Sequence, residues 1–415
     1  MKSPIVVVGA GAAGIIAAWK AASMGADVVL LEKTERIGTK ILISGGGKCN
    51  ITHAGSIDSV LRAFRPNEAR FLRGPMYRFT NEHILELLHS HGLRTYVREN
   101  GRVFPVDQTA KDVVQILERC LREVKVPIRT GNAVTDLVAI GGRMEKVVSE
   151  KATILSNHVI VSVGGSSYPK SGTTGDGYPW MLSLGHTLQP IRAALAPMEL
   201  GVSGIKKWAG IALRDCVLKA KLNGREIARW REDLLFTHRG VSGPCALGIS
   251  REVAEFWHEG AAELQIDVCP KLNFEVVQQD LQNQKAKFPN RIATHLVQGF
   301  IPNNLVDDFL EQAEICPDSK LQQVSKKQLN VLANQLKAWS IGTVKEVLLD
   351  KGEVVAGGVD LSEVDPQTRR SQKVEGLYLC GEILDVDGPV GGYNLQAAWS
   401  TGYVAGESAA RAWLD

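Results

Sequence analysis

Two short, unbroken apolar runs with a helical segment between them open the hydrophobic pattern of this chain. Ile5–Val8 is a run of β-branched residues, and Val28–Leu31 is a second apolar run of similar length. The intervening segment Gly14–Met24 contains no proline and has helical character. Continuous apolar runs are typical of strands that are buried on both faces, and two such strands joined by a helix form a βαβ unit. The pattern therefore predicts a parallel sheet.

The following stretch, up to about residue 165, mixes helices with short strands. Apolar residues recur at helical spacing in Ile84–Leu88 and again in Val113–Leu121, which predicts two amphipathic helices. Alternating or β-branched patterns and Gly-containing turns predict strands or hairpins at Gly101–Phe104, Ala133–Val138, Arg143–Ser149 and Val159–Val163.

The pattern of apolar and polar residues changes after Pro190. Asn223-Gly224 lies between the alternating segments Asp215–Leu222 and Glu226–Trp230, and this arrangement is the strongest short-range signal for a hairpin. Glu263–Val268 predicts one more strand. Residues 271–340 are polar and helical, with prolines at 289, 302 and 317. We therefore expect a β-rich part followed by about three helices.

A third pattern begins near Val344, where apolar runs return. Glu353–Val359 and Leu377–Cys380 predict strands, and a helix is expected from Asn394 almost to the end. That helix carries small residues suited to close packing: Ala397, Ala398, Gly402, Ala405, Gly406, Ala409 and Ala410. The three patterns together indicate a first domain that is interrupted by an insertion and resumes near the C-terminus.

Composition narrows the class of protein. The chain has 415 residues, of which 44% are hydrophobic and 22% charged, as in globular proteins and unlike disordered ones. Its 48 Lys and Arg nearly balance 45 Asp and Glu, which gives no support for a dedicated nucleic-acid binder. Ile5–Ala18 is too short and too rich in Gly and Ala to span a bilayer. We expect a cytoplasmic protein with no membrane partner.

Local charge and cysteine usage add two details. Residues 201–250 hold nine Lys and Arg against four Asp and Glu, a net of +5, whereas residues 351–415 hold five against ten, a net of −5. Seven cysteines are scattered and form no C-x-x-C pair. An odd, scattered set argues against a disulfide framework and against a zinc site, so no metal is expected.

The turn after the first strand carries the most specific chemistry. Gly9-Ala10-Gly11-Ala12-Ala13-Gly14 fits G-x-G-x-x-G between a strand and a helix. Gly9 permits the tight turn, Gly11 lets backbone N–H groups approach a pyrophosphate, and Gly14 allows close helix packing. Glu32 ends the second strand, 18 residues past Gly14, where a carboxylate binds an adenosine ribose and repels a 2′-phosphate. These features predict FAD or NAD rather than NADP.

Two further segments favour FAD. Ser44-Gly45-Gly46-Gly47-Lys48-Cys49-Asn50 closely follows the Glu32 strand, and consecutive glycines of this kind form backbone nests for anions. Gly381–Gln396 joins a short strand to the last helix; there Glu382 is placed to hold ribityl hydroxyls, and the helix N-terminus near Asn394 to face the N1 edge of a flavin. A long bipartite ligand needs such additional loops, and a simple dehydrogenase does not.

These segments resemble the YhiN/BaiN-type flavoproteins, which have a glutathione-reductase-like FAD domain. The resemblance spans the whole chain, with dense motifs at both ends and sparse ones from 190 to 340. It implies an α/β fold with a Rossmann-like FAD-binding domain that is split in sequence, an inserted β-barrel-like part and a small helical part. The expected divisions are 1–189 and 344–415 for the FAD-binding domain, 190–270 for the β-rich insert and 271–343 for the helical insert.

The resemblance also assigns residues to the cofactor. By this match the residues that line FAD are Gly9, Gly11, Gly14, Glu32, Lys33, Lys40, Ser44, Asn50, Gly381, Glu382, Asn394 and Leu395, and Val134 makes the backbone contact to adenine. Gly45 and Gly164 belong to two of the matching loops and are expected at the same site.

Candidates for the chemical step are fewer. Tyr168 lies in the Gly- and hydroxyl-rich segment 163–178, which either closes over the flavin or serves as a structural crossover. Cys49 is a redox thiol or a small packed side chain. His238 is a general base or the cap of a loop. Tyr393, before the last helix, is a further candidate.

The resemblance implies an FAD-dependent oxidoreductase that moves hydride between flavin N5 and a small-molecule substrate. Disulfide reductases of this superfamily carry a second G-x-G-x-x-G and a C-x-x-x-x-C, and both are missing here. The electron donor is therefore either a transient NAD(P)H co-substrate or the substrate itself. A flavoprotein that modifies RNA and a flavin-binding regulatory protein remain as alternatives, with the +5 segment motivating the first. The sequence leaves the oligomeric state open.

Overall fold

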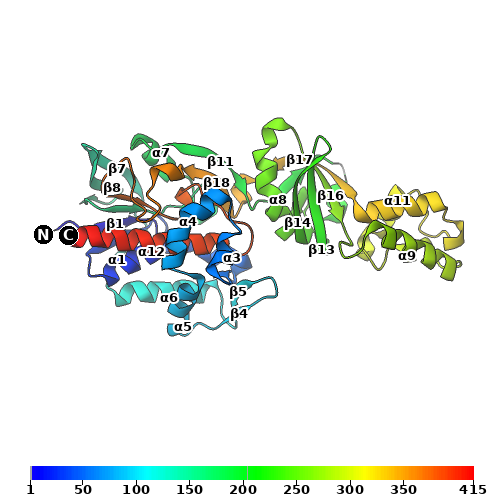
Figure 1. Cartoon of the computed structure of the whole chain (residues 1–415), viewed down its shortest axis with the longest axis horizontal. Helices are drawn as coiled ribbons and strands as arrows, with labels where there is room; N and C mark the ends of the chain where they lie inside the picture. The colour runs from blue at the N-terminus through cyan, green and yellow to red at the C-terminus, as the bar shows by residue number, and fades with distance from the viewer. Residues whose placement is uncertain (1, 203) are drawn as a thin grey trace. The chain divides into compact units, whose positions relative to one another are not determined.

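The computed structural model describes residues 2–202 and 204–415, which divide into two compact units (Figure 1). The first unit combines the segment that ends at Arg192 with Glu353–Asp415, and the second is Ala193–Gly352. The first domain is thus interrupted and resumes after the insertion.

A five-stranded parallel sheet forms the centre of the first unit, in the order β19-β10-β1-β2-β6. Four of these strands are buried along their whole length, which explains their continuous apolar runs. The chain passes from β1 to β2 on one side and later places β10 on the other. Ligands of open α/β sheets bind where the strand order reverses in this way. The bounds are β1 Ile5–Val8, β2 Val28–Leu31, β6 Ile128–Arg129, β10 Val159–Val161 and β19 Leu377–Leu379.

Two helices far apart in sequence pack side by side in this unit, α1 (Ala12–Ser23) and α12 (Tyr393–Leu414) (Figure 1). A Cβ atom added to Gly402 would lie 2.2 Å from the carbonyl oxygen of Ala13, and one added to Gly406 would lie 2.2 Å from that of Ala17. The backbones can approach this closely only because these positions lack side chains. The small residues expected in the last helix therefore do serve close packing.

Smaller sheets and helices surround the central sheet. The predicted hairpins at Gly101–Phe104 and Ala133–Ser149 are confirmed within two antiparallel sheets, β3-β5-β4 and β7-β8-β9. Their strands are β3 Thr52–His53, β4 Thr95–Val97, β5 Arg102–Pro105, β7 Val134–Ile140, β8 Arg143–Ser149 and β9 Thr153–Leu155. The remaining elements are α2 Thr39–Ile43, α3 Ile57–Leu61, α4 Pro66–Arg78, α5 Asn81–Ser90, α6 Ala110–Glu123, α7 Gly177–Ser183, β11 Leu188–Ala194 and β18 Val354–Val359.

The second unit is built on a closed barrel of six strands in the order β12-β15-β14-β13-β16-β17. The predicted Asn223-Gly224 turn joins β13 to β14, and the two strands pair as an antiparallel hairpin. Trp339 packs within 4.9 Å of Trp208 and 4.6 Å of Phe309, measured between ring centroids. The strands are β12 Met198–Leu200, β13 Ala212–Leu222, β14 Arg225–Phe236, β15 Gly240–Ser242, β16 Glu263–Asp267 and β17 Trp339–Val347. The expected β-barrel-like insert is confirmed.

Three helices are inserted between β16 and β17, as expected, with α9 (Phe274–Lys287) packed on α11 (Lys326–Lys337), and α10 (Val306–Gln312) between them in sequence. Two elements differ from expectation. Residues 339–343, assigned to the helical part, begin strand β17, whose pattern is interrupted at Gly342, where φ is +111°. Helix α8 (Gly243–Glu255) lies in the segment expected to be purely β-rich.

Candidate functional site

The glycines of the turn after β1 are needed for two different reasons. A Cβ on Gly9 would lie 2.7 Å from the carbonyl oxygen of Ser162, and a Cβ on Gly14 would lie 1.9 Å from that of Gly9. These two glycines are needed by the packing of the protein itself. A Cβ on Gly11 would meet nothing within 4 Å. Gly11 therefore borders open space at the N-terminus of α1, where a pyrophosphate would accept backbone hydrogen bonds.

Glu32 follows β2 and is held in a fixed orientation beside this turn. Its Oε2 accepts a hydrogen bond from the Ala10 N–H at 2.8 Å, and its Oε1 accepts one from the Thr34 N–H at 2.8 Å. The chain that leads into β7 runs along the same place, because the Asn132 N–H donates to the Glu32 carbonyl at 3.0 Å. Val134 follows two residues later as the first residue of β7, and its contact with adenine stays a prediction.

Lys33 and Lys40 tie distant segments together. Lys33 Nζ donates to Thr174 Oγ1 at 2.6 Å and also pairs with Asp176. Lys40 Nζ forms an ion pair with Glu382 Oε2 at 2.7 Å, and that carboxylate also accepts a bond from the Val355 N–H at 3.0 Å. Both lysines belong to the segment after β2, so this segment is anchored to the loop after β10 and to the one after β19.

Ser167 and Gly164 complete this junction. Lys40 Nζ also donates to Ser167 Oγ at 3.0 Å. A Cβ on Gly164, where φ is +75°, would lie 3.6 Å from Glu382 Oε2, so the loop backbone approaches the carboxylate directly. Gly381 has φ of +74°, and a Cβ there would lie 2.9 Å from that of Ala13 in α1. The expected cofactor residues of three segments thus converge at the carboxyl ends of the parallel strands.

The glycine loop and the last helix also meet. Gly45 has φ of +56°, and Ser44 Oγ donates to the Ile41 carbonyl at 2.8 Å. Asn50 connects this loop to α12, because its amide oxygen accepts from the Gly392 N–H at 2.9 Å. Gly392, with φ of +91°, immediately precedes the helix. The two segments that were both expected at a flavin ring therefore lie together.

Asn394 and Leu395 are in the first turn of α12. The Asn394 side chain is engaged by the protein: its Oδ1 accepts from the Gly388 N–H and its Nδ2 donates to the Gly388 carbonyl, both at 2.7 Å. Leu395 is half-buried. What these residues offer a ligand is therefore the backbone of a helix N-terminus, which favours partial negative charge.

Three of the four catalytic candidates lie in different surroundings, and the fourth, Tyr393, begins helix α12. Cys49 is fully buried, and burial raises the pKa of its thiol to about 12, which keeps the thiol protonated and fits a packed side chain. Tyr168 is exposed and has φ of +53° before a short 3-10 turn. His238 is exposed in the turn between β14 and β15. Their roles stay predictions.

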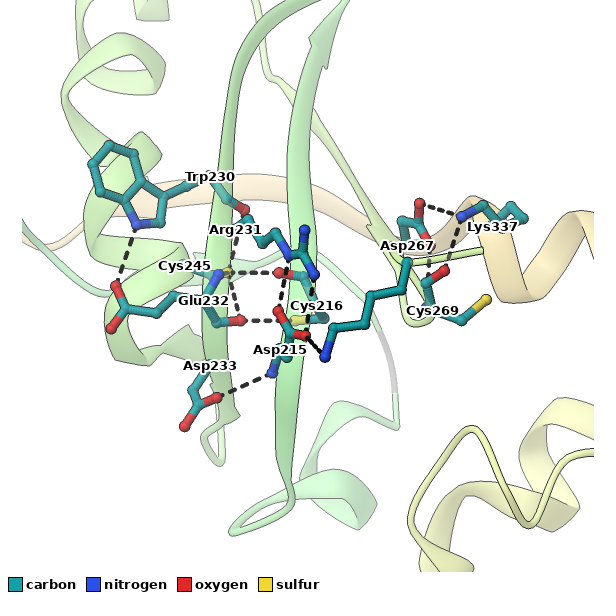
Figure 2. A network of polar contacts seen from close by, with 11 residues as sticks. Asp215, Cys216, Trp230, Arg231, Glu232, Asp233, Cys245, Asp267, Cys269 and Lys337 are labelled. Carbon is teal, nitrogen blue, oxygen red and sulfur yellow. Dashed lines mark hydrogen bonds and ion pairs between the residues drawn. The ribbon is translucent and has the colours of Figure 1, made fainter. Parts of the chain in front are cut away.

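Basic residues of the segment 201–250 form ion pairs with acids inside and outside that segment. Asp215 accepts from Arg231 at 2.8 Å (Figure 2) and pairs with Lys271 at 3.0 Å. These contacts lower the pKa of Asp215 to about 2. Five of the nine basic residues in 201–250 have acidic partners, namely Lys207, Arg214, Arg229, Arg231 and Arg239. Three of these pairs use acids already counted in the net of +5, whereas the pairs of Lys207 with Asp308 and of Arg239 with Glu199 use acids outside the segment and offset two of the excess charges.

Residues 2–202 and 204–415 contain neither a metal-binding cluster nor a membrane-spanning helix. No group of three or more His, Cys, Asp or Glu side chains there is arranged to hold a metal ion. Within the same ranges, no helix has the length and apolar character needed to cross a bilayer.

The sequence patterns did not indicate two residues that support the site through contacts within the protein, Ser162 and His53. Ser162 Oγ donates to the carbonyls of Val8 and Gly9, at 2.8 and 2.9 Å, and so fixes the glycine turn. His53 stacks on Tyr393 with ring centroids 4.6 Å apart and an interplanar angle of 18°. A hydroxyl residue at the end of a strand before Gly-Gly was the available signal for Ser162. No local pattern marks His53, because its partner is 340 residues away.

Similarity to known proteins agrees with this geometry. The chain is 32% identical over 407 residues to the 3-dehydro-bile acid delta(4,6)-reductase of Clostridium scindens, covering 97% of this chain and 98% of that protein. It is 30% identical over 405 residues to the ribosomal RNA dihydrouridine synthase of Escherichia coli, with coverages of 97% and 96%.

Among solved structures, the 3-ketosteroid delta1-dehydrogenase of Sterolibacterium denitrificans in complex with 1,4-androstadiene-3,17-dione matches with a TM-score of 0.56 at 14% identity, over 99% of this chain and 100% of that one. This likeness concerns the fold alone. A family model described as HI0933-like protein Rossmann domain matches residues 3–408. The chain therefore belongs to the HI0933-like family of FAD-dependent oxidoreductases with a Rossmann domain, and the resemblance to YhiN/BaiN-type flavoproteins is confirmed.

Proposed function

We propose that this protein is an FAD-dependent reductase that adds hydrogen across a polarised carbon–carbon double bond of a small molecule. The observation that carries the FAD assignment is the convergence of the open space at Gly11, the fixed Glu32 carboxylate and the Lys40–Glu382 ion pair at one edge of the sheet. The printed names of the relatives support the reaction type, because a delta(4,6)-reductase and a dihydrouridine synthase both act on such double bonds.

Each group of residues has a defined task in this proposal. Gly11 and the α1 N-terminus bind the pyrophosphate, Glu32 the adenosine ribose, and Glu382 the ribityl chain. The Asn50–Gly392 contact and the first turn of α12 would face the flavin ring. Bound FAD supplies a site that accepts or donates a hydride at N5. The protein binds and orients both partners.

The electron donor we propose is NADH or NADPH that binds transiently. Anaerobic stopped-flow absorbance, with the purified protein mixed separately with each nucleotide, tests this directly. Rapid bleaching of the visible flavin band with either one supports a nicotinamide-driven reductase. Bound FAD that neither nucleotide bleaches, although dithionite does, contradicts the donor and points to a substrate that is itself the donor.

A second candidate function is the reduction of uridine in RNA. One observation favours it: two relatives are named ribosomal RNA dihydrouridine synthase, from Escherichia coli and Haemophilus influenzae, each 30% identical to this chain. Lys207 and Arg239 pair with acids outside the 201–250 segment, Asp308 and Glu199, and these pairs offset two of its five excess positive charges. Filter binding with ribosomal RNA and bulk tRNA at physiological salt distinguishes the two functions. Binding no tighter than non-specific association, in the range of about 10⁻⁴–10⁻⁶ M, removes this candidate.

A further inference from the structure

Tyr393 combines an immobilised ring with an unengaged hydroxyl. The ring stacks on His53 at 4.6 Å and meets Phe64 edge-on at 6.2 Å, between centroids. A Cβ on Gly391 would lie 2.6 Å from Tyr393 Cε2, and one on Gly388 would lie 2.9 Å from Tyr393 Cβ. The ring is therefore enclosed by two side chains and two glycine backbones. Tyr393 is half-buried. Within the described ranges, its hydroxyl makes no hydrogen bond to another residue.

The position of Tyr393 is set by the elements already assigned to the ring end of the cofactor. It is the first residue of α12, directly after Gly392, whose N–H is bound by Asn50. The backbone and the ring of Tyr393 are held by the protein, whereas its hydroxyl bonds to no described residue. Such a hydroxyl is available to a ligand.

His53 lies against the ring in an unusual hydrogen-bonding environment. Its Nδ1 lies 2.7 Å from the Ala54 carbonyl oxygen and its Nε2 lies 3.1 Å from that of Asn100. Backbone carbonyls therefore lie within hydrogen-bond distance of both ring nitrogens and fix the orientation of the imidazole. Gly101 makes room for this arrangement, since a Cβ there would lie 2.3 Å from His53 Cε1. The His53 ring is thereby fixed in its stacked position on the phenol ring.

A positive charge near Tyr393 suits a phenol that loses a proton. Burial raises the pKa of Tyr393, while the positive charge of nearby Arg102 acts in the opposite direction. Arg102 stands opposite His53 in the β3–β5 register. As negative charge develops on the phenol oxygen, the positive charge of Arg102 stabilises it.

We propose that Tyr393 is the proton donor of the reduction and that His53 is the residue that positions its ring. This inference rests on the proposed function. The reaction places a hydride from reduced flavin on one carbon of the double bond and a proton on the other. Tyr393 breaks its O–H bond to supply that proton, and the phenolate regains one from water. The reductant is a reduced nicotinamide or, in the assay, dithionite.

The test compares Tyr393→Phe with Tyr403→Phe. Tyr403 is a matched control because it lies on the same helix and stacks on Phe79 at 4.7 Å and 16°. Each holoenzyme is reduced anaerobically with dithionite and mixed with the conjugated ketone 4-androstene-3,17-dione, the compound bound in one structural neighbour. We expect Tyr393→Phe to keep its FAD and its reduction by dithionite but to be reoxidised roughly 10²–10⁴-fold more slowly. Reoxidation within about threefold of wild type overturns the proposal.

A second readout does not depend on turnover. 4-Nitrophenolate mimics an enolate oxygen, and its binding to the oxidised holoenzyme is followed by absorbance. We expect the Kd to rise at least about tenfold in Tyr393→Phe, the loss of one charge-assisted hydrogen bond, and to stay unchanged in Tyr403→Phe. An unchanged Kd in Tyr393→Phe, or no binding to wild type that holds FAD, overturns the proposal. A wild-type protein that cannot hold FAD defeats the proposed function instead.

His53→Phe separates positioning from simple packing, because it keeps an aromatic ring beside Tyr393 and removes both ring nitrogens, and with them the contacts to the Ala54 and Asn100 carbonyls. We expect it to retain FAD and to show an enlarged solvent isotope effect on reoxidation, since proton transfer from Tyr393 becomes slower. Wild-type reoxidation with a wild-type isotope effect contradicts the role of His53.

Discussion

Replacing Gly11 by alanine should remove FAD binding while leaving the protein folded. The Gly11 φ is −81°, which alanine adopts freely, and the added Cβ would meet nothing within 4 Å. We therefore expect the free energy of unfolding of the apoprotein to change by less than about 1 kcal/mol, with the weaker N-cap preference of alanine included.

The effect on the cofactor should be much larger. The new methyl group would occupy the space in which the pyrophosphate approaches the α1 N-terminus. Two charge-assisted hydrogen bonds at about 1.5–3 kcal/mol each are then lost or lengthened. This corresponds to a Kd for FAD that is roughly 10²–10⁴-fold higher.

Gly14→Ala is the contrasting variant. Its Cβ would lie 1.9 Å from the Gly9 carbonyl oxygen and 2.4 Å from Ser162 Oγ, so the backbone must shift and stability should fall by about 1–3 kcal/mol or more. FAD affinity is measured by quenching of flavin fluorescence, and apoprotein stability by urea denaturation. If Gly11→Ala binds FAD within about threefold of wild type, the pyrophosphate does not lie over Gly11 and the placement of the cofactor is refuted.

Three other outcomes are expected. In Gly406→Ala the new Cβ would lie 2.2 Å from the Ala17 carbonyl oxygen, so the free energy of unfolding in urea should fall by about 1–3 kcal/mol. In the exposed control Gly299→Ala the Cβ has open space around it, and the free energy of unfolding should stay within about 0.5 kcal/mol of wild type. Burial lowers the pKa of His186 below its ordinary value. Because the unfolded chain then takes up a proton that the folded chain resists, the free energy of unfolding should fall as pH drops from about 7 to 5, and less steeply in His186→Gln; an equal slope in both proteins contradicts this. Cys316 is the one exposed thiol among the seven cysteines, so a thiol reagent should label one site rapidly in the native protein, and Cys316→Ser should abolish that fast phase; rapid labelling that persists in the variant shows a second accessible thiol.

Local patterns in the sequence predicted the parts of the site that are made from neighbouring residues. The β-branched run before Gly9 and the carboxylate at Glu32 sufficed for the dinucleotide turn, because strand, turn and helix follow one another directly. The Asn223-Gly224 hairpin was predictable for the same reason.

Long-range contacts were beyond such reasoning. The Lys40–Glu382 ion pair joins residues 342 positions apart, and its existence depends on how the split domain closes. Strand β17 was missed because Gly342 breaks its alternation and because its partners, β12 and β16, precede it by many residues. The stacking of His53 on Tyr393 likewise has no local signal.

The most direct test of the whole account is one anaerobic experiment on the purified protein. The flavin is released and identified, and the reduced holoenzyme is then mixed with a conjugated ketone. The account predicts one FAD per chain and recovery of the visible flavin band as the double bond is saturated. A protein that binds no flavin after reconstitution, or a reduced flavin that only oxygen reoxidises while conjugated ketones and uridine-containing RNA leave it bleached, would contradict it.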